Sequence, residues 1–516
     1  MTSEDTPLQQ LKDSILAQVR DYAAKRHASC LPGNDARKPV FRPGIDTVPY
    51  AGRVFDANEV EAAVASCLDF WLTLGTEGDR LREALQQFLG VKHTVLVNSG
   101  SSANLVALTA LTSHKLPADR RLRPGDEVIT VAAGFPTTAS PILQNGCVPV
   151  FIDADPATGN ARVDQLEKAL SSRTKAVMMA HTLGNPFDLG AVLAFCRRHN
   201  LWLVEDNCDA LGCTYSMPVG KARELGLDRL LRLAEKSEGP DCLPRIENGV
   251  LTAYTGSFGD LSTQSFYPPH HLTMGEGGAV NVVGDMKLKI IVESIRDWGR
   301  DCWCGSGMDD TCHKRFRWKL GDLPEGYDHK YIYSHLGYNL KPLDVQAAIG
   351  YRQMEKLPAF IEARKKNWEY LRRGLDCCGD ALEFALPTHA LSWSADNGFV
   401  WDDTGERTAC SWFGFMMTLK PGAPFTRTEL ALCLDEARIG NRMLFGGNLV
   451  KQPAFVQLRC DAKPGDEPFR TPVPLDGADA IMERSIFIGT YPGLSTEMMD
   501  YMIATIAGFV EERRRA

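Results

Sequence analysis

The N-terminal stretch of the chain alternates apolar and polar residues with the period of a helix. Leu8, Leu11, Ile15 and Val19 recur three or four positions apart, which predicts an amphipathic helix within residues 1–30. Its apolar side needs a partner, so we expect this helix to pack on another element or on a second subunit. The following stretch, 31–53, contains Pro and Gly and predicts an extended arm.

Short apolar runs then alternate with helical patterns over more than a hundred residues. The expected strands are 94–97, 127–131, 148–153, 176–180 and 201–204. The expected helices between them are 104–111, 139–144, 163–170 and 191–199. Strands that alternate with helices at this spacing predict an α/β fold with a mostly parallel sheet covered on both faces.

The second half of the chain changes character at one long helical pattern, which runs from 344 to about 374. Beyond it we expect a smaller C-terminal α+β domain, with a strand at 411–419 and helices at 428–437 and 496–512. The predicted division is therefore an N-terminal helix and arm (1–54), a large domain (55–345), and a linking helix with a small domain (346–516).

Composition excludes several classes of function. With 57 Lys+Arg against 65 Asp+Glu the formal charge is -8, which argues against a nucleic-acid partner. The N-terminus lacks the apolar core of a signal peptide, and no apolar run of about 18 residues could span a membrane. We therefore expect a soluble cytoplasmic protein, in which the 15 cysteines are reduced thiols, core residues or metal ligands.

Candidate ligand-binding residues follow two of the predicted strands. The turn after strand 94–97 contains Gly100, Ser101 and Ser102 and opens a helix, whose free N–H groups suit a phosphate. Asp206 and Asp209 follow strand 201–204. Carboxylates at this end of a strand lie where open α/β sheets bind ligands.

The stretch 255–280 carries the most informative pattern, with Ser265, the pair His270 and His271, and a glycine-rich exit. Two adjacent histidines alone are typical of a solvated loop. The whole run, however, resembles the cofactor-lysine loop of the DegT/DnrJ/EryC1/StrS sugar aminotransferases. His270 has the spacing of that family's lysine, five residues after Ser265 and five before Gly275. Without a lysine amine, pyridoxal phosphate (PLP) cannot be tethered covalently.

The resemblance implies the type I fold of the aspartate aminotransferases and roles for individual residues. Gly100, Ser101, Ser102 and Ser265 would hold the cofactor phosphate, and Phe135 would stack on its ring. Asp206 would face the pyridine nitrogen, and Asp209 stands where the family usually has glutamine. The segment 216–253 is an insertion relative to the family, with an amphipathic helix predicted at 222–236. It is expected to form a surface helical hairpin or, alternatively, to dock a partner.

Further contacts are implied near the predicted small domain and across a subunit boundary. Asn339 and Lys341 belong to a segment that in this family reaches the neighbouring subunit's site, which implies a homodimer; a Tyr-rich structural turn is the alternative. Arg442 could pair with a substrate diphosphate or be an ordinary surface arginine. His271 is a second candidate for substrate contact.

Cys302, Cys304 and Cys312 form a C-x-C-x7-C group in a glycine-bearing stretch, residues 302–312. Thiols this close in a loop can converge on one metal centre, with zinc and chance spacing as alternatives. Cys208 is the first candidate for a fourth ligand, with Cys213 and Cys242 in reserve. Together with the lost lysine, this set resembles the family's iron-sulfur branch of CDP-4-keto-6-deoxyglucose 3-dehydrases, in which these cysteines would hold a 2Fe-2S cluster.

The resemblance predicts a function. Pyridoxamine 5'-phosphate (PMP) and a 2Fe-2S cluster would serve C3 deoxygenation of a CDP-4-keto-6-deoxyhexose in lipopolysaccharide dideoxysugar biosynthesis, with His270 as the base. No G-x-G-x-x-G fingerprint is evident, so the NAD(P)H and flavin chemistry should belong to a separate reductase. Two alternatives stay open: a cluster-free 3-dehydratase of a GDP-4-keto-6-deoxysugar, and a non-catalytic homologue that binds a nucleotide sugar.

Overall fold

The computed structural model describes residues 5–237, 242–305 and 307–515. The predicted insertion and the predicted cysteine loop therefore include positions, 238–241 and 306, that lie outside the described residues.

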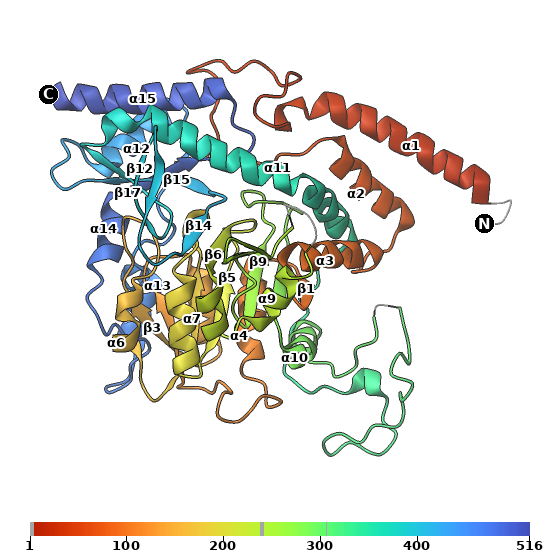
Figure 1. The fold of residues 1–516 in the computed structure, drawn as a ribbon. Coiled ribbons are helices and arrows are strands. Elements are labelled where there is room, and N and C mark those ends of the chain that lie inside the picture. The colour runs from red at the N-terminus through yellow and green to blue at the C-terminus, as the bar shows by residue number, and fades with distance from the viewer. Residues whose placement is uncertain (1–4, 238–241, 306, 516) are drawn as a thin grey trace.

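A seven-stranded sheet forms the centre of the large domain (Figure 1). In spatial order its strands are β1 (His93–Val97), β10 (Gly278–Val282), β9 (Leu261–Ser265), β5 (Trp202–Asp206), β4 (Thr174–Ala180), β2 (Glu127–Val131) and β3 (Val148–Ile152). The ladder from β9 to β3 is parallel, whereas β10 runs antiparallel to both β9 and β1. The strands are buried almost throughout, because helices cover both faces. The predicted α/β fold with a mostly parallel sheet is confirmed.

The helices that connect these strands are α4 (Gly100–Ala110), α5 (Pro136–Gln144), α6 (Leu166–Ala169) and α7 (Leu189–Arg198), and α10 (Met286–Arg296) follows the last strand, β10. α4 begins four residues before its predicted start, because the Ser99 side chain accepts a hydrogen bond from the Ser102 N–H and caps the helix. The predicted helix 163–170 is a 3-10 turn, η2 (Val163–Gln165), followed by α6. Another 3-10 turn, η3 (Thr182–Gly184), follows β4.

The expected helical hairpin at 216–253 is wrong in part, because strands flank its helices. β6 (Thr214–Pro218), β7 (Arg245–Glu247) and β8 (Val250–Tyr254) join β14 (Arg407–Ala409) in an antiparallel sheet. The single helix predicted at 222–236 is two helices, α8 (Val219–Glu224) and α9 (Asp228–Ala234). Gly226, with a φ of 65°, takes a left-handed conformation that separates them.

The C-terminal part forms a second core around the sheet β11–β15–β17–β16. Its strands are β11 (Leu382–Phe384), β15 (Gly414–Leu419), β17 (Ser485–Gly489) and β16 (Asn441–Arg442), and its helices are α12 (Arg427–Glu436), α13 (Pro453–Asp461), α14 (Asp476–Arg484) and α15 (Thr496–Arg515). A hairpin, β12 (Ala390–Ser394) and β13 (Gly398–Trp401), and the 3-10 turns η5 (Asp376–Cys378) and η6 (Leu449–Lys451) complete it. The long α11 (Asp344–Gly374) joins the two parts, as predicted (Figure 1).

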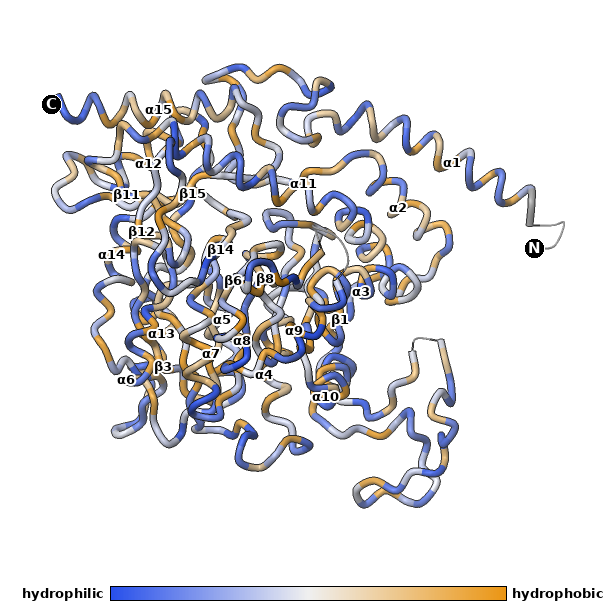
Figure 2. Tube along the Cα trace, in the orientation of Figure 1, coloured by the Kyte–Doolittle hydropathy of each residue, from blue (hydrophilic) through white to orange (hydrophobic). Residues whose placement is uncertain are grey.

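Three helices precede the sheet: α1 (Asp5–Arg26), α2 (Ala57–Asp69) and α3 (Thr76–Leu89), with the 3-10 turn η1 (Ala28–Cys30) after α1. α1 alternates hydrophilic and hydrophobic residues (Figure 2) and lies against α2, with an ion pair between Lys12 and Asp69. Among the described residues, no helix combines the length and the apolar character that crossing a bilayer requires.

The segment between α10 and α11 is irregular apart from one 3-10 turn, η4 (His329–Tyr331). Figure 1 shows it projecting from the body of the molecule beside α10. It contains three of the predicted cysteine ligands.

Candidate active site

A cavity of about 620 Å³ opens at the carboxyl ends of β4, β5 and β9, the edge where parallel α/β sheets bind ligands. Nine of the residues singled out from the sequence line it: Gly100, Ser101, Phe135, Asp206, Cys208, Asp209, Ser265, His270 and Arg442. Residues from both cores contribute, so the cavity lies between the large sheet and the C-terminal part.

The predicted phosphate cradle is assembled from α4 and the end of β9. A Cβ on Gly100 would lie 2.4 Å from the Cβ of Ser265, so only glycine allows this approach. The cap formed by Ser99 uses the N–H of Ser102. The N–H groups of Gly100 and Ser101 have no hydrogen-bond partner among the described residues and point out of the helix start. They form a ready site for an anion.

Asp206 is the buried carboxylate at the end of β5. Its Oδ2 accepts hydrogen bonds from Asn104 Nδ2 at 2.8 Å and from Thr138 Oγ1 at 2.7 Å, and its Oδ1 accepts from the Cys208 N–H at 3.2 Å. The Thr263 hydroxyl also donates to Oδ1, at 3.4 Å, and the four contacts fix the carboxylate where it lines the cavity. A charged group held this way can pair with a protonated ring nitrogen.

His270 lies in the cavity wall with its ring edge-on to Phe413, 5.4 Å between centroids. Its Nδ1 is 3.2 Å from the carbonyl oxygen of Ser265, so a proton on Nδ1 donates there and Nε2 keeps its lone pair. Burial lowers the pKa of His270 to about 4. The ring is therefore neutral at pH 7 and can accept a proton.

Asp209 lies close to the same ring, with Oδ1 3.7 Å from His270 Nε2. Burial, and secondarily the charge of Asp206, raise the pKa of Asp209 to about 7. The carboxyl group therefore changes its protonation state near neutral pH, beside the nitrogen that would take a proton.

Arg364 of α11 contacts the loop that carries His270. The sequence analysis did not predict this residue. It is almost fully buried, and its guanidinium donates to the carbonyl oxygens of His270 and Trp412, both at 3.1 Å. Burial lowers the pKa of this arginine to about 10. Its bonds fix the backbone that presents the His270 ring, and a lone arginine in a long helix gives no sequence signal of such a role.

The open side of the cavity carries aromatic and cationic groups. Phe135 is half exposed and contacts Phe445 edge-on, at 5.8 Å between centroids. The Arg442 guanidinium lies 4.2 Å from the ring centroid of Tyr50. A guanidinium stacked on an aromatic face still presents its N–H groups to a phosphate.

Four predicted contacts lie outside the cavity of their own chain. Ser102 accepts a hydrogen bond from the Ser99 hydroxyl in the helix cap. His271 points away from the cavity: Nε2 is 2.6 Å from the carbonyl oxygen of Ser411, and burial holds its pKa well below the usual value. Lys341 pairs with Asp297 at 2.9 Å and also contacts Asn339. The predicted roles of these residues stay predictions.

The predicted cysteine ligands fall in two places. Cys208 lines the cavity, 3.9 Å from the Thr263 hydroxyl. Cys302 and Cys304 lie next to each other in the projecting segment, and the Cys304 N–H donates to the Cys302 sulfur at 3.4 Å. The Thr311 N–H donates to the Cys304 sulfur at the same distance. N–H···S bonds of this kind stabilise thiolates.

Cys312 lies further along the segment and contacts a buried histidine that the sequence analysis did not select. Its sulfur is 3.7 Å from Nδ1 of His329, whose Nε2 is 3.0 Å from Asp301. The His329 ring stacks on Trp318, 4.6 Å between centroids. Among the described residues the sulfur atoms of Cys302, Cys304 and Cys312 are not all within 4.8 Å of one another, so the loop is not a closed site for a single ion.

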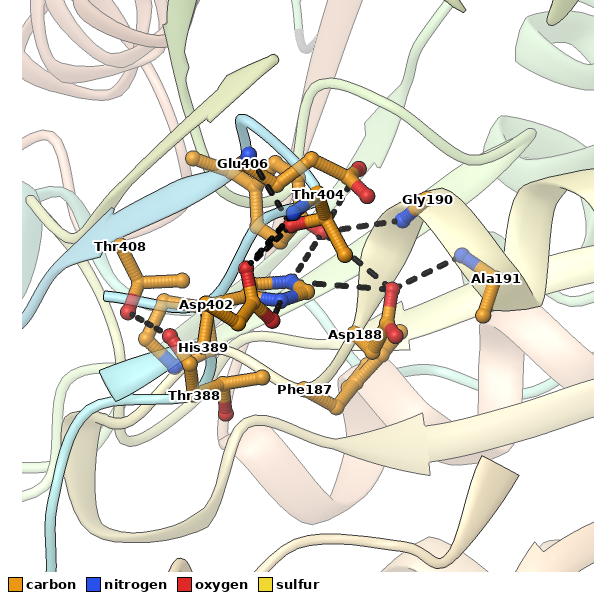
Figure 3. Close-up of polar contacts among 12 residues, drawn as sticks. Phe187, Asp188, Gly190, Ala191, Thr388, His389, Asp402, Thr404, Glu406 and Thr408 are labelled. Atoms are coloured by element: carbon orange, nitrogen blue, oxygen red, sulfur yellow. Dashed lines mark hydrogen bonds and ion pairs between the residues drawn. The ribbon is translucent and has the colours of Figure 1, made fainter. Parts of the chain in front are cut away.

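Another polar cluster lies away from the cavity, where β14 joins β6 (Figure 3). Ligand-type atoms of Asp188, His389 and Glu406 lie within 4.8 Å of one another. The hydroxyl of Tyr215 lies among them, 2.7 Å from His389 Nε2 and 3.0 Å from Glu406, and Lys221 pairs with Glu406. We interpret this cluster as a hydrogen-bonded network that links the segment 389–409 to the large domain.

Comparison with known proteins identifies the family of this chain. Residues 55–507 match the DegT/DnrJ/EryC1/StrS aminotransferase family. The lipopolysaccharide biosynthesis protein RfbH of Salmonella typhimurium is 46% identical over 500 residues, covering 97% of this chain and 98% of that protein. The dTDP-4-dehydro-2,6-dideoxy-D-glucose 3-dehydratase of Saccharopolyspora spinosa is 42% identical over 499 residues, covering 97% and 92%.

Among solved structures, an Escherichia coli GDP-4-keto-6-deoxy-D-mannose-3-dehydratase with bound hydrated PLP superposes with a TM-score of 0.69 at 25% identity, covering 89% of this chain and 99% of that one. The relatives are enzymes of sugar biosynthesis, among them 3-dehydratases that use PLP-type cofactors. By the length of its match and its identity to these relatives, this chain belongs to the DegT/DnrJ/EryC1/StrS aminotransferase family.

Proposed function

We propose that the chain is a PMP- and 2Fe-2S-dependent 3-dehydrase that removes the C3 hydroxyl of a CDP-linked 4-keto-6-deoxyhexose, for dideoxysugars of lipopolysaccharide. The observation that carries the proposal is a neutral imidazole, His270, in the cavity wall where the family has its tethering lysine. A lysine there would capture the cofactor, whereas an imidazole can move a proton and leave the cofactor's amine free.

The residues of the cavity fit a phosphorylated pyridine. The tight approach of Gly100 to Ser265 leaves a cradle that a Cβ would fill, and the free N–H groups of α4 suit a phosphate. When bound, PMP supplies a primary amine that condenses with the C4 ketone and a ring that accepts electrons. Asp206 would keep the ring nitrogen protonated, and Phe135 would lie against the ring.

His270 would take the proton that must leave before the C3 hydroxyl can depart. Its Nδ1–H donates to the Ser265 carbonyl, so Nε2 is the basic atom. The protonated ring would then be stabilised by Asp209 and could return the proton to the departing hydroxyl, which leaves as water. Arg364 fixes the loop so that the ring does not turn away during these transfers.

Deoxygenation also needs two electrons and two protons, because a C–O bond is replaced by a C–H bond. A 2Fe-2S cluster would supply the electrons one at a time from a separate NAD(P)H-dependent reductase. Cys302, Cys304, Cys312 and Cys208 would hold the cluster. The N–H···S bonds to Cys302 and Cys304 support a loop prepared for thiolate ligands.

The substrate assignment rests on Arg442 and on the combination of His270 with the four cysteines. Arg442 could bind the diphosphate at the cavity's open side. Relatives are named for dTDP- and GDP-linked 4-keto sugars, so the class of a nucleotide-linked 4-keto-6-deoxyhexose is common to them. The CDP base follows from the resemblance of the cysteine pattern.

The test is a turnover assay of protein purified without oxygen and loaded with PMP. CDP- and GDP-4-keto-6-deoxyhexoses would be compared as substrates in the presence of a chemical reductant. The same protein would be analysed for iron and sulfide and by electron paramagnetic resonance. We expect 3-deoxy product from the CDP sugar and a 2Fe-2S signal after reduction. Iron-free protein that dehydrates the GDP sugar would instead support the cluster-free 3-dehydratase. That second candidate is favoured by one observation: the loop thiols do not line the cavity of their own chain.

A further inference from the structure

The N-terminal arm, residues 31–53, runs from η1 to α2 along the C-terminal part of the molecule (Figure 1). Near its start, the Gly33 N–H donates to the carbonyl oxygen of Pro492 at 2.8 Å. Near its end, Val48 forms a parallel bridge with Ile439, two residues before β16 begins. The arm therefore extends to the open side of the cavity, where β16 contributes to the wall.

Two glycines hold the backbone of Tyr50 where β16 begins and β17 ends. A Cβ on Gly440 would lie 2.7 Å from the Tyr50 nitrogen, and a Cβ on Gly489 would lie 2.3 Å from its carbonyl oxygen. The arm can lie this close only because neither position has a side chain. The Gly440 N–H also donates to the carbonyl oxygen of Val48 at 2.8 Å, and Val48 is fully buried. This packing fixes the backbone that presents the Tyr50 ring.

The ring of Tyr50 lines the cavity and lies under the guanidinium of Arg442. It contacts Phe487 edge-on, at 6.1 Å between centroids, and the central carbon of the guanidinium lies 4.2 Å from its own centroid. Arg442 Nη1 also donates to the carbonyl oxygen of Asn441 at 2.6 Å. Among the described residues, no carboxylate pairs with Arg442. A ring and one carbonyl thus orient this cation, and its other N–H groups can bind an anion in the cavity.

Tyr50 precedes the stretch of the chain that matches the family, which begins at residue 55. The family resemblance therefore gives it no role, although it lines the same cavity as the residues to which the resemblance does give roles. An arginine side chain has several rotatable bonds, and ordering such a side chain on binding costs affinity. A ring fixed against one face of the guanidinium restricts these rotations before a ligand arrives, so the cost of ordering Arg442 is reduced.

We propose that Tyr50 is a positioning residue for Arg442, and that the stacked pair binds the diphosphate of a nucleotide-linked sugar. The inference rests on the proposed function, which places a diphosphate at Arg442, and adds to it the arm residue that presents the guanidinium. Tyr50 acts on substrate binding through Arg442, whereas the proton transfer is assigned to His270. A change at Tyr50 should therefore alter the affinity for the nucleotide and leave the chemical step unchanged.

Binding of CDP to protein loaded with PMP tests the pair, because this probe carries the diphosphate but no sugar that could react. Isothermal titration calorimetry would compare wild type with variants at the two positions. Tyr50→Leu should raise the dissociation constant of CDP about three- to tenfold, because the cation loses its aromatic face. Tyr50→Met, a second variant without that face, should give the same loss. Tyr50→Phe keeps the face and should bind within about twofold of wild type. Arg442→Gln should weaken binding about tenfold or more.

The double variant Tyr50→Leu/Arg442→Gln separates positioning from general packing. If Tyr50 acts through Arg442, adding Tyr50→Leu to Arg442→Gln should change the dissociation constant by less than about twofold. In turnover assays, Tyr50→Leu should raise KM while kcat stays within about twofold of wild type. Arg459→Gln is the matched control, since Arg459 also lies over an aromatic ring, that of Phe469, but does not line the cavity. This control should bind CDP as wild type does.

CDP binding that is weakened in Arg442→Gln but unchanged in Tyr50→Leu and Tyr50→Met would overturn the inference alone. So would losses that add in the double variant, because Tyr50 would then act independently of Arg442. A loss in Tyr50→Phe equal to that in Tyr50→Leu would assign the effect to the hydroxyl and overturn the stacking role as well. Unchanged binding by Arg442→Gln, or wild type that does not bind CDP, would overturn the substrate assignment of the proposed function, and the inference with it.

Discussion

The cavity and the cysteine segment contain the two halves of the proposed chemistry, and they are built in opposite ways. The cavity is formed by the ends of buried strands, and its central carboxylate, Asp206, accepts four hydrogen bonds from fixed partners. The segment between α10 and α11 is irregular and fastened at its base by pairs such as Lys115 with Asp301. The comparison teaches that the ends of buried strands fix the groups of one site, whereas a few side-chain contacts at its base hold the segment that carries the other.

A large effect is expected at Asp206. Asp206→Asn keeps the shape but removes the charge that would pair with the ring nitrogen, so turnover should fall by about 10²–10³-fold. The three loop cysteines do not contact this carboxylate, whereas the N–H of Cys208, the fourth proposed ligand, donates to it. A turnover assay of PMP-loaded protein measures the loss of activity, and metal analysis measures the iron content. Thr138→Val, which removes one donor to Asp206, is a graded control with a smaller loss. Unchanged turnover in Asp206→Asn, at equal PMP occupancy, would contradict the proposed pairing of Asp206 with the ring nitrogen.

The converse change should affect only the cluster. Cys304→Ser is expected to remove the 2Fe-2S absorption and the paramagnetic signal, while PMP affinity stays within about twofold, because a bond to iron is lost but no cavity contact changes. Equilibrium titration with PMP and metal analysis measure the two effects. Cys460→Ser, at an exposed cysteine outside the segment, is the matched control. Unchanged iron in Cys304→Ser would remove this residue from the ligand set.

A smaller effect is expected at the phosphate cradle. In Gly100→Ala the added Cβ would collide with Ser265, and we expect the dissociation constant of PMP to rise about tenfold, or about 1.4 kcal/mol. Gly220→Ala is the control, since a Cβ there meets nothing within 4 Å. If the two alanine variants bind PMP equally well, the phosphate lies elsewhere.

A further effect concerns stability and its dependence on pH. The pKa of Asp209 is about 7 in the fold against an ordinary 3.8, so the unfolded chain releases this proton first. Its contribution to stability is therefore full below pH 3.8 and is lost as pH rises to about 7. Asp209→Asn should stabilise the protein at pH 8, by at most about 4 kcal/mol, and gain nothing near pH 4. Thermal unfolding across this range measures it, with exposed Asp466→Asn as control. A gain that did not vary with pH would contradict the assigned shift.

Much of the cavity could be predicted from the sequence because its residues follow strands whose pattern is clear. Asp206 ends β5, and the turn at Gly100 opens α4, so strand order alone brings them to one edge. Arg364 could not be predicted, since its contacts with His270 and Trp412 depend on how α11 packs across the two cores. The helix at 222–236 was wrong because Gly226 breaks it, although its leucines keep a helical period.

The cysteine segment shows where sequence reasoning is weakest. Spacing grouped Cys302, Cys304 and Cys312, but no periodic pattern fixes an irregular segment in space. Cys208 lines the cavity, whereas the described residues of the segment do not. His329, beside Cys312, gave no signal because a single histidine in a loop has many ordinary roles.

The most direct test of the central claim is the turnover of His270→Asn loaded with PMP. Asparagine keeps a polar group in the cavity wall but cannot accept a proton as imidazole does. We predict that the variant binds PMP as wild type does and loses turnover by about 10³-fold or more. Turnover within tenfold of wild type, at equal PMP occupancy, would contradict His270 as the base that replaces the family's lysine.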